Sequence, residues 1–176
     1  MKQTRLILVG GFLGAGKTTL LWETAVRLMN KGLRVGLITN DQAPELVDSE
    51  LLKLSDLRVA EVSGSCFCCN FNGFTDAIKE IRAEASADVI IAEPVGSCTD
   101  LSATIMQPLK QYWNTELKIS PLTVLADPNR LVSILNGGNG GLHPDAAYIY
   151  KKQLEESDII SVSYTHLRAH ETDQYL

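Results

Sequence analysis

The sequence predicts a three-layer α/β sandwich built on a mostly parallel central sheet. Short apolar runs typical of strands alternate along the chain with segments of helical periodicity. Several of these runs, such as the VIIA of residues 89–92, are apolar at every position, which is typical of strands covered on both faces. With 176 residues, 45% of them hydrophobic, the chain has room for one domain with a real core.

The strands and helices are expected in alternating order. Apolar runs predict strands at residues 5–10, 34–39, 57–62, 88–93 and 121–127, and a further strand that begins at Asp158. Helical patterns stand at about 17–30, 48–54, 101–112 and 144–156, and Phe74, Ala77, Ile78 and Ile81 mark one face of a further helix after the cysteines. Gly32 closes the first helix, and the NGGNGG of residues 136–141 predicts a loop before the last.

The loop after the first expected strand carries a strong chemical signal. Its sequence GGFLGAGKTT fits the pattern G-x-x-x-x-G-K-[ST], with Gly11, Gly16, Lys17 and Thr18 at the fixed positions. The glycines permit a backbone curl in which successive N–H groups and the N-terminus of the next helix point at phosphate oxygens. Lys17 adds a cation near the β- and γ-phosphates, and the Thr18 hydroxyl suits Mg²⁺. The sequence therefore predicts a P-loop that binds a nucleoside triphosphate.

Polar residues follow two further expected strands. Ligands of open α/β sheets lie beyond the carboxyl ends of the strands, where Glu93 is a candidate for a water-mediated contact to Mg²⁺. The Gly96 N–H could approach a γ-phosphate, whose loss would release the loop. Asn40, Asp41 and Asp48 could orient the attacking water or help to hold the metal. The alternatives are a solvated carboxylate for Glu93 and an ordinary polar turn for the others.

Three of the four cysteines stand within four consecutive positions after the strand 57–62. In an extended backbone Cys66 and Cys68 point the same way, and a bend into the next helix would bring Cys69 to them. Three thiolates suit Zn²⁺ and related ions but leave a tetrahedral metal one ligand short, as in a site that exchanges its metal. The fourth ligand could be water, a second subunit, a client protein or Cys98, although a small buried residue is the favoured interpretation of Cys98. Packed or redox-active thiols are the alternative for the trio.

Composition excludes several classes of function. The 16 lysines and arginines against 21 aspartates and glutamates give a net charge of −5, which argues against nucleic acid as a partner. No run of eighteen apolar residues and no leader-like N-terminus is present in the sequence, so we expect a cytoplasmic protein without a membrane segment. In a reducing compartment, cysteines serve as metal ligands or reactive thiols more often than as disulfides.

The end of the chain, from about residue 161 to 176, is interpreted as a non-native tail. Its segment VSYTHLRAHET is what one reading frame of a transposase-type sequencing adapter encodes. His166 and His170 would otherwise suggest a zinc-binding pair on one helix face. We therefore expect residues 1–160 to form a nucleotide-binding domain that is truncated at its C-terminal end, and we leave residues 161–176 out of the argument.

Over residues 4–160 the chain resembles the CobW branch of the CobW/HypB/UreG family of P-loop GTPases. The resemblance rests on four stretches: GGFLGAGKTT, NDQAPELVD, the Cys66-x-Cys68-Cys69 cluster and EPVG. The resemblance implies that Thr18 and Glu93 serve Mg²⁺, that the three cysteines bind a transition metal, and that Lys17, Asp41, Glu93 and Gly96 serve hydrolysis. It also implies a set of residues that bind the phosphates of GTP: Gly11, Gly14, Ala15, Gly16, Lys17, Thr18 and Thr19.

The resemblance implies a function as well. It indicates a metallochaperone or metal-insertion GTPase, in which the nucleotide state controls transfer of zinc or cobalt to a client metalloprotein or cofactor-biosynthesis enzyme, with a homodimer as one option. The family's guanine-reading Asn-Lys-x-Asp motif is expected just after Ile160, where the adapter-like sequence stands, so a chain without it could be inactive. The alternatives are a P-loop kinase of a small molecule and a zinc-binding module without a catalytic role.

Overall fold

The computed structural model describes residues 3–40 and 57–162. The first part contains β1 (Thr4–Gly11), α1 (Lys17–Met29) and β2 (Val35–Thr39). The second begins with β3 (Leu57–Glu61), α2 (Phe71–Ala85), β4 (Val89–Glu93), the π-helical turn η2 (Ser102–Met106) and α3 (Gln107–Tyr112). It continues with β5 (Leu117–Ile119), β6 (Thr123–Ala126), α4 (Pro128–Leu135), α5 (Pro144–Glu155) and β7 (Ile159–Val162).

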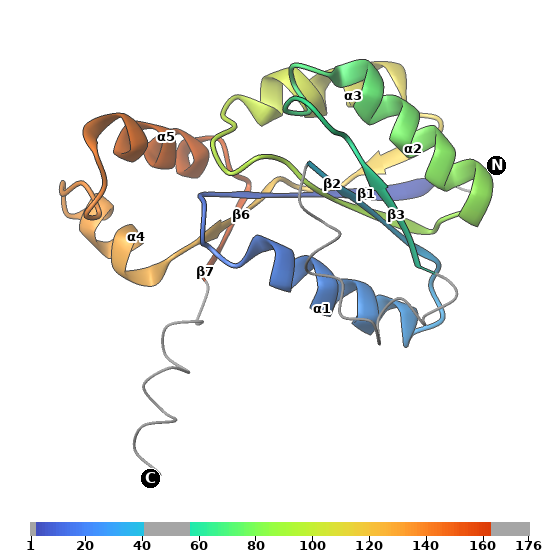
Figure 1. Ribbon diagram of the computed structural model, residues 1–176, viewed down its shortest axis with the longest axis horizontal. Helices are drawn as coiled ribbons and strands as arrows, with labels where there is room; N and C mark the ends of the chain where they lie inside the picture. Colours follow the sequence, from blue (N-terminus) through green and yellow to red (C-terminus); the bar gives the residue numbers. More distant parts are fainter. Residues whose placement is uncertain (1–2, 41–56, 163–176) are drawn as a thin grey trace, which may run out of the picture.

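The strands form one sheet in the order β3-β2-β4-β1-β6-β7, with β5 beside the first half of β1 (Figure 1). Every strand pair in the described part of the chain is parallel. The register aligns Thr39 at the end of β2 with Glu93 at the end of β4. The residues that follow these strands and β1 therefore emerge at one edge of the sheet, as the sequence predicts.

Alternate side chains of the central strands pack in opposite directions. Leu6 and Leu8 of β1 join a core cluster with Phe74 of α2 and Leu109 of α3. Val9 joins the cluster on the other face, which contains Leu21 of α1. Figure 1 shows α1 on one side of the sheet and α2 and α3 on the other. The prediction of a three-layer α/β sandwich is confirmed.

Some elements differ from the sequence-based expectation. The helix expected at 101–112 is divided into η2 and α3. Pro108 has no N–H for an α-helical bond to Thr104, and the wider π turn avoids the clash of its ring with that carbonyl. Neither α4 nor β5 was expected. The predicted helix at 48–54 lies outside the described residues.

The expected tail lies almost wholly outside the described residues as well. Its first two positions, Ser161 and Val162, pair with Leu125 and Ala126 as the end of β7. The residues beyond them are not described. The non-native origin of residues 161–176 therefore stays a prediction.

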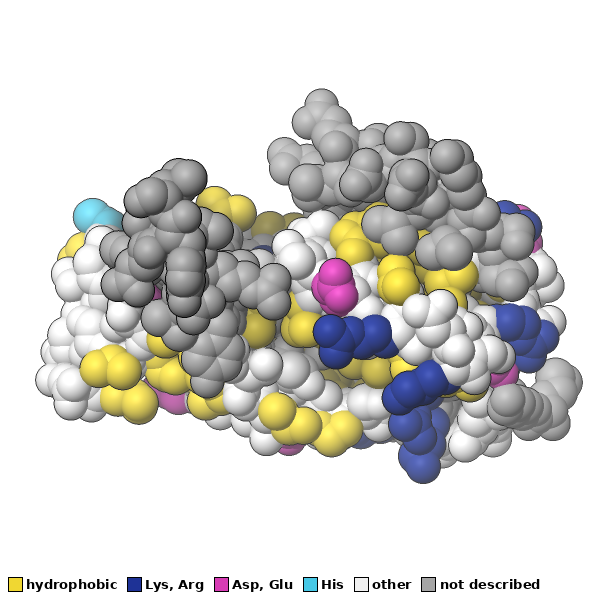
Figure 2. Space-filling view, turned by 90° about the horizontal axis from the view of Figure 1, so that it is seen from below, with side chains coloured by type: hydrophobic (Ala, Val, Ile, Leu, Met, Phe, Trp, Pro, Cys, Tyr) yellow, Lys and Arg dark blue, Asp and Glu magenta, His cyan; other side chains and the backbone are white. Residues whose placement is uncertain are grey.

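Figure 2 views the molecule from the side of α1. On the described part of this face, lysine and arginine side chains stand in small groups among hydrophobic and neutral ones and form no continuous basic surface. Among the described residues, no helix has both the length and the apolar character needed to cross a membrane.

Candidate functional site

The loop between β1 and α1 has the backbone that the glycine pattern predicts. Gly14 and Gly16 adopt left-handed φ values of 77° and 89°. Gly11 has φ 137°, and a Cβ added there would lie 2.5 Å from the carbonyl oxygen of Leu125 in β6. Side chains at these positions would therefore strain the loop or push β6 away. The loop ends at the first turn of α1, whose N–H groups suit an anion.

Lys17, Thr18 and Glu93 form a compact polar group at this edge. The Lys17 Nζ donates to the carbonyl oxygen of Phe12 at 3.3 Å and lies 3.7 Å from a Glu93 carboxylate oxygen. The Thr18 hydroxyl donates to the two oxygens of the same carboxylate, at 3.1 and 3.2 Å. The hydroxyl and the carboxylate are oxygen ligands of the kind that Mg²⁺ prefers, so this pair fits the predicted magnesium role.

The charges in this group are partly withdrawn from water. Lys17 is only 6% exposed, and burial lowers the pKa of its ammonium group, against the opposing charge of Glu93 and, more weakly, of Cys98. Burial raises the pKa of Glu93, although Lys17 and Thr18 oppose the shift. The buried Lys17 ammonium group, whose charge is opposed here by the Glu93 carboxylate, would be stabilised by a further negative group such as a phosphate.

Gly96 lies against the phosphate-binding loop. A Cβ added to it would be 3.0 Å from the Leu13 nitrogen and 3.2 Å from the Lys17 Nζ. Gly96 therefore lies beside the loop and the lysine that are expected to hold the phosphates, and its contact with a γ-phosphate stays a prediction. The loop from 94 to 101 is held from the other side by Gln153 of α5, which is 2% exposed and donates to the carbonyl oxygens of Gly96 and Cys98, both at 2.9 Å.

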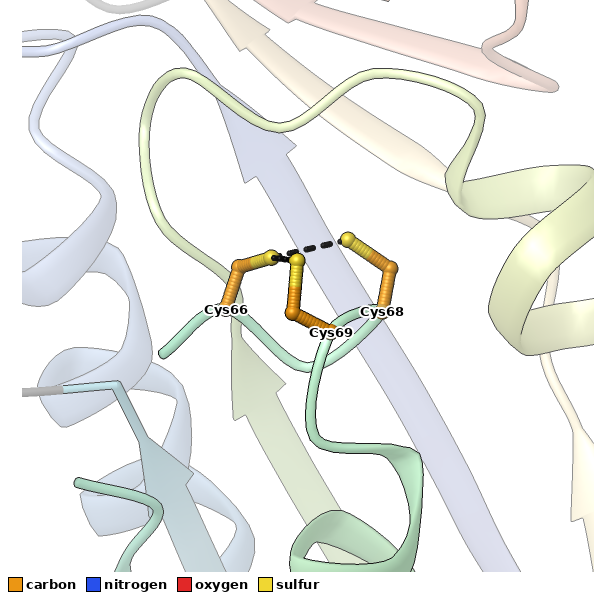
Figure 3. A group of neighbouring side chains, drawn as sticks. All are labelled: Cys66, Cys68 and Cys69. Carbon is orange, nitrogen blue, oxygen red and sulfur yellow. Dashed lines mark hydrogen bonds between the residues drawn. The ribbon is translucent and has the colours of Figure 1, made fainter. Parts of the chain in front are cut away.

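The loop between β3 and α2 brings three cysteines together, as Figure 3 shows. The Cys66 Sγ lies 2.9 Å from that of Cys68 and 2.8 Å from that of Cys69, and the three sulfurs all lie within 4.8 Å of one another. A turn closes the cluster, because the Cys69 N–H donates to the Cys66 carbonyl oxygen at 3.0 Å. Phe67, fully buried, anchors this turn by stacking on Phe74 of α2 with ring centroids 4.4 Å apart.

The three thiols do not share one acidity. Burial alone would raise the pKa of Cys66, but its hydrogen bonds with Cys68 and Cys69 prevail and lower the pKa to about 7. Burial and the same hydrogen bonds raise the pKa of Cys68 to about 11. The hydrogen bond with Cys66 also raises the pKa of Cys69. Cys66 is therefore the thiol that ionises first, and its thiolate is the form that binds metal.

Two contacts join the loop that carries the cysteines to the edge of the sheet at which the phosphate-binding loop stands. Asn40, directly after β2, donates through its Nδ2 to the carbonyl oxygens of Val62 and Ser65, both at 2.6 Å. Cys66 and Cys68 pack against the core cluster that contains Cys98, two residues after Gly96. In Figure 3 the yellow-green loop that follows β4 arches over the three sulfurs. The cysteine loop and the loop after β4 therefore lie at the same edge of the sheet as the phosphate-binding loop, and we call this edge the rim.

The described site residues all lie at this rim. Gly11, Gly16, Lys17, Thr18, Glu93 and Gly96 come together, and so do Cys66, Cys68 and Cys69 beside them. Asp41 and Asp48 lie outside the described residues, so their predicted roles stay predictions. Asn40 holds the cysteine loop, and its predicted role near the water or the metal stays a prediction. Gln153 could not be predicted from the sequence, because hydrogen bonds donated to backbone carbonyls follow no residue pattern.

Comparisons with known proteins agree with this geometry. The family model described as "CobW/HypB/UreG, nucleotide-binding domain" matches residues 5–175. The zinc chaperone YeiR of Escherichia coli (strain K12) is 23% identical over 177 aligned positions, which cover 98% of this chain and 50% of that protein. The zinc chaperone CobW of Pseudomonas aeruginosa is 33% identical over 100 positions, 51% of this chain and 26% of that protein.

A further relative is the zinc-regulated GTPase metalloprotein activator 1 of Dictyostelium discoideum, 29% identical over 102 positions, which cover 50% of this chain and 21% of that protein. The chain thus spans half or less of the length of these three relatives.

Solved structures show the same fold. The zinc-bound YjiA GTPase of E. coli superimposes with a TM-score of 0.62 at 18% identity, covering 98% of this chain and 54% of that one. The hydrogenase maturation factor HypB of Archaeoglobus fulgidus gives 0.57 at 14% identity, covering 96% and 70%. With the family model matched over nearly the whole length, the chain belongs to the CobW/HypB/UreG family of P-loop GTPases, through its nucleotide-binding domain.

Proposed function

We propose that this chain is the nucleotide-binding part of a GTP-hydrolysing metallochaperone, which passes a thiolate-bound zinc or cobalt ion to a client. The client would be a metalloprotein or an enzyme of cofactor biosynthesis, and a homodimer is one form in which the protein could act. Relatives named as zinc chaperones support zinc as the first metal to test. The metal is cargo in this proposal, whereas Mg²⁺ accompanies the nucleotide.

One observation carries the proposal: the loop after β4 contacts both candidate sites. Glu93, at its start, accepts the Thr18 hydrogen bonds, and Gly96 lies against Lys17. Two residues further on, Cys98 packs in the cluster against which Cys66 and Cys68 lie. A γ-phosphate beside Lys17 would meet this loop, and its loss would free the loop at the end that borders the thiols.

The residues have distinct roles in the proposed reaction. The loop backbone and Lys17 hold the phosphates, while Thr18 and Glu93 hold Mg²⁺, directly or through water. Water attacks the γ-phosphorus, the bond to the β-phosphate oxygen breaks, and GDP and inorganic phosphate form. We propose that Asp41 orients this water. The released phosphate no longer holds Gly96, so the loop relaxes and the thiolate site changes its affinity for the metal.

The proposal is tested by titrating Zn²⁺ into the chain in the presence of GDP or of a non-hydrolysable GTP analogue with Mg²⁺. A coupling of the usual size, about 1–3 kcal/mol, would change the zinc affinity by roughly 5- to 150-fold between the two states. Equal affinities would contradict the proposal. Repeating the titration with the ATP analogue tests the guanine preference, because ATP should then have no effect.

Hydrolysis assays separate the proposal from its alternatives. A slow basal GTP hydrolysis that responds to zinc supports it, whereas a small-molecule kinase would consume nucleotide only with its acceptor present. In a zinc module without catalytic role, Lys17→Ala would leave every zinc-dependent property unchanged. In the proposed GTPase the same change abolishes the effect of the nucleotide on zinc affinity.

A further inference from the structure

All four cysteines of the chain gather at one place in the fold, although one of them is distant in sequence. Cys66, Cys68 and Cys69 stand on the loop before α2, and Cys98 stands on the loop after β4. Cys66 and Cys68 pack against the core cluster to which Cys98, 7% exposed, belongs. The three clustered sulfurs alone leave a tetrahedral metal one protein ligand short.

Electrostatics supports the same proximity. Burial raises the pKa of Cys98, and the charges of Cys66 and Cys68 raise it further. Cys98 in turn contributes to the lowering of the pKa of Cys66, through a weak hydrogen bond. Cys98 is not part of the group of sulfurs that lie within 4.8 Å of one another, so its sulfur must move closer to at least one of the three for all four to bind one metal.

The cluster has the right size to open around a metal. A Zn–S bond of about 2.3 Å places two thiolates of a tetrahedral site roughly 3.8 Å apart. The Cys66 sulfur lies 2.9 and 2.8 Å from its two neighbours, so these sulfurs need to separate by only about 1 Å. The fourth ligand of such a site must come from outside the trio, and in Figure 3 the loop after β4 passes beside the cluster.

We propose that Cys98 is the fourth thiolate of this metal site. Binding exchanges the Cys98 S–H bond for an S–metal bond and releases the proton to water, as for every other thiol of the site that is still protonated. The buried position of Cys98 then has a use beyond packing, since a closed four-thiolate site excludes water from the metal.

Gln153 is the residue that positions this ligand. Its side-chain amide donates to the carbonyl oxygens of Gly96 and Cys98, so that α5 fixes the backbone on either side of Ser97. Gly96 borders the phosphate site, whereas Cys98 borders the metal site. This role of Gln153 rests on the proposed function, in which the fourth metal ligand is the group that the nucleotide would move.

The test counts sulfur ligands directly. X-ray absorption at the zinc edge should give four sulfur neighbours per zinc ion in the reduced chain without nucleotide. Cys98→Ser and Cys98→Ala should each give three sulfurs and one lighter atom. With Co²⁺ as the probe, the thiolate-to-cobalt charge-transfer absorption per bound ion should fall by about a quarter in these variants, in proportion to the lost Co–S bond.

Two further variants calibrate the measurement. Cys69→Ser removes a ligand from the trio and should give the same loss of about a quarter of the absorption. Ser97→Ala changes the exposed neighbour of Cys98 and should leave the spectrum unchanged. Folding of every variant is checked by circular dichroism. If the Cys98 variants do not fold, the sulfur count of the unaltered chain decides alone.

Three sulfurs in the unaltered chain, or a spectrum that Cys98→Ser and Cys98→Ala leave unchanged, would overturn the assignment. Four sulfurs that appear only when zinc joins two chains, as seen by mass measurement, would overturn it too. The experiment needs no nucleotide, so it can fail while nucleotide still alters zinc affinity. Conversely, a four-sulfur site with equal zinc affinity in both nucleotide states would refute the proposed function and keep Cys98 as a ligand.

Discussion

At the scale of single residues, Lys17 is held in an unusual state. It is buried, and among the described residues its charge is compensated by the Glu93 carboxylate at 3.7 Å and the Phe12 carbonyl oxygen at 3.3 Å. A buried cation of this kind has most to gain from a bound phosphate, because a second negative group repays its desolvation. Its contribution to nucleotide binding should therefore exceed that of any exposed lysine.

We predict that Lys17→Ala weakens binding of a GTP analogue by roughly 10- to 100-fold, the effect of losing one charge-assisted hydrogen bond of about 1.5–3 kcal/mol. Fluorescence titration with a labelled nucleotide measures the loss. Lys31→Ala, at an exposed lysine after α1, is the matched control and should bind normally. An equal loss in both variants would mean that general charge, and not the buried site, governs affinity.

The pKa of Cys66 predicts how zinc affinity depends on pH. Zinc binds thiolates, so every thiol still protonated must release a proton, and each such proton changes the affinity tenfold per pH unit. Above about pH 7 Cys66 is already ionised, whereas Cys68 and Cys69, whose pKa values are raised, are not. As the pH falls through 7, Cys66 takes up a proton, and zinc must then displace one more proton in order to bind.

The logarithm of the zinc affinity should therefore fall more steeply below pH 6.5 than above pH 7.5, by about one further unit per pH unit. Competition with a chelator of known affinity across this range measures both slopes. Cys66→Ser removes the early-ionising thiol and should abolish the change in slope. A single constant slope in the unaltered chain would show that Cys66 has no lowered pKa.

Residue identities could be predicted where the pattern is local. The phosphate-binding loop uses neighbouring residues whose types and order suit a phosphate. The cysteine trio can be recognised as well, because its three residues are also close together in the sequence. Neither the Gln153 contact nor the Asn40 contact could be predicted, because each joins residues more than twenty positions apart through backbone carbonyls. The gathering of Cys98 with the trio depends on how two loops fold, which spacing alone does not determine.

At the scale of elements, one face of α5 supports the whole rim. Tyr150 packs its ring edge against Phe12 of the phosphate-binding loop at 5.9 Å. Gln153, one turn later, holds Gly96 and Cys98, and Glu156 accepts a hydrogen bond from the Ser102 N–H at the start of η2. Spacing of three residues places these side chains on the same face. The last described helix is therefore a support for both candidate sites.

The glycines of the phosphate-binding loop offer a matched pair of substitutions. At Gly11 an added Cβ would meet the Leu125 carbonyl oxygen at 2.5 Å, in addition to the unfavourable φ of 137°. At Gly14, with φ 77°, nothing lies within 4 Å of the added atom. The first position tests contact between β1 and β6, whereas the second tests backbone strain alone.

We predict that Gly11→Ala destabilises the fold by about 2–6 kcal/mol, from overpacking and backbone strain together. Gly14→Ala should cost about 1–2 kcal/mol, from strain alone. Urea unfolding followed by circular dichroism gives both values. Equal losses at the two positions would show that β6 moves aside without cost.

Element prediction succeeded for the buried strands, such as β2 and β4, and for the partly exposed β3, and it failed for β5 and α4. The parallel strands are apolar enough to be recognised, but β5 has three residues and is separated from β6 by Pro121, which interrupts the run. The signal for α4 was present: Asp127 accepts a hydrogen bond from the Arg130 N–H as N-cap, and Pro128 follows at the first turn.

At the scale of the whole molecule, the sheet order explains why two chemically different sites are neighbours. The strand β4 lies between β1 and β2, so the loop after β4 runs between the phosphate-binding loop and the end of β2. Strand β3 pairs with β2 at the sheet edge, and the cysteines follow it directly. Four parallel strands thus bring the phosphate-binding loop, the Glu93 carboxylate, Asn40 and the thiol cluster to one rim.

Coupling between nucleotide and zinc binding can be measured through the thermal stability of the chain, because each ligand stabilises the fold by an amount set by its affinity. A nucleotide at a hundred times its dissociation constant adds about 2.7 kcal/mol, which corresponds to a rise in Tm of roughly 5–11 °C for a chain of this length. Zinc adds its own increment. If the sites were independent, the two increments would add; coupling of about 1–3 kcal/mol makes the sum depart by roughly 2–12 °C.

We predict this departure for the chain with zinc and the GTP analogue together, measured by calorimetry in four samples: free, with nucleotide, with zinc and with both. Linkage requires that zinc change the nucleotide affinity by the same factor by which nucleotide changes the zinc affinity. Cys68→Ser, which weakens the metal site, should restore additivity while the nucleotide increment stays intact. Additive increments in the unaltered chain would mean that the rim holds two sites without communication, and that its loops respond to each ligand separately.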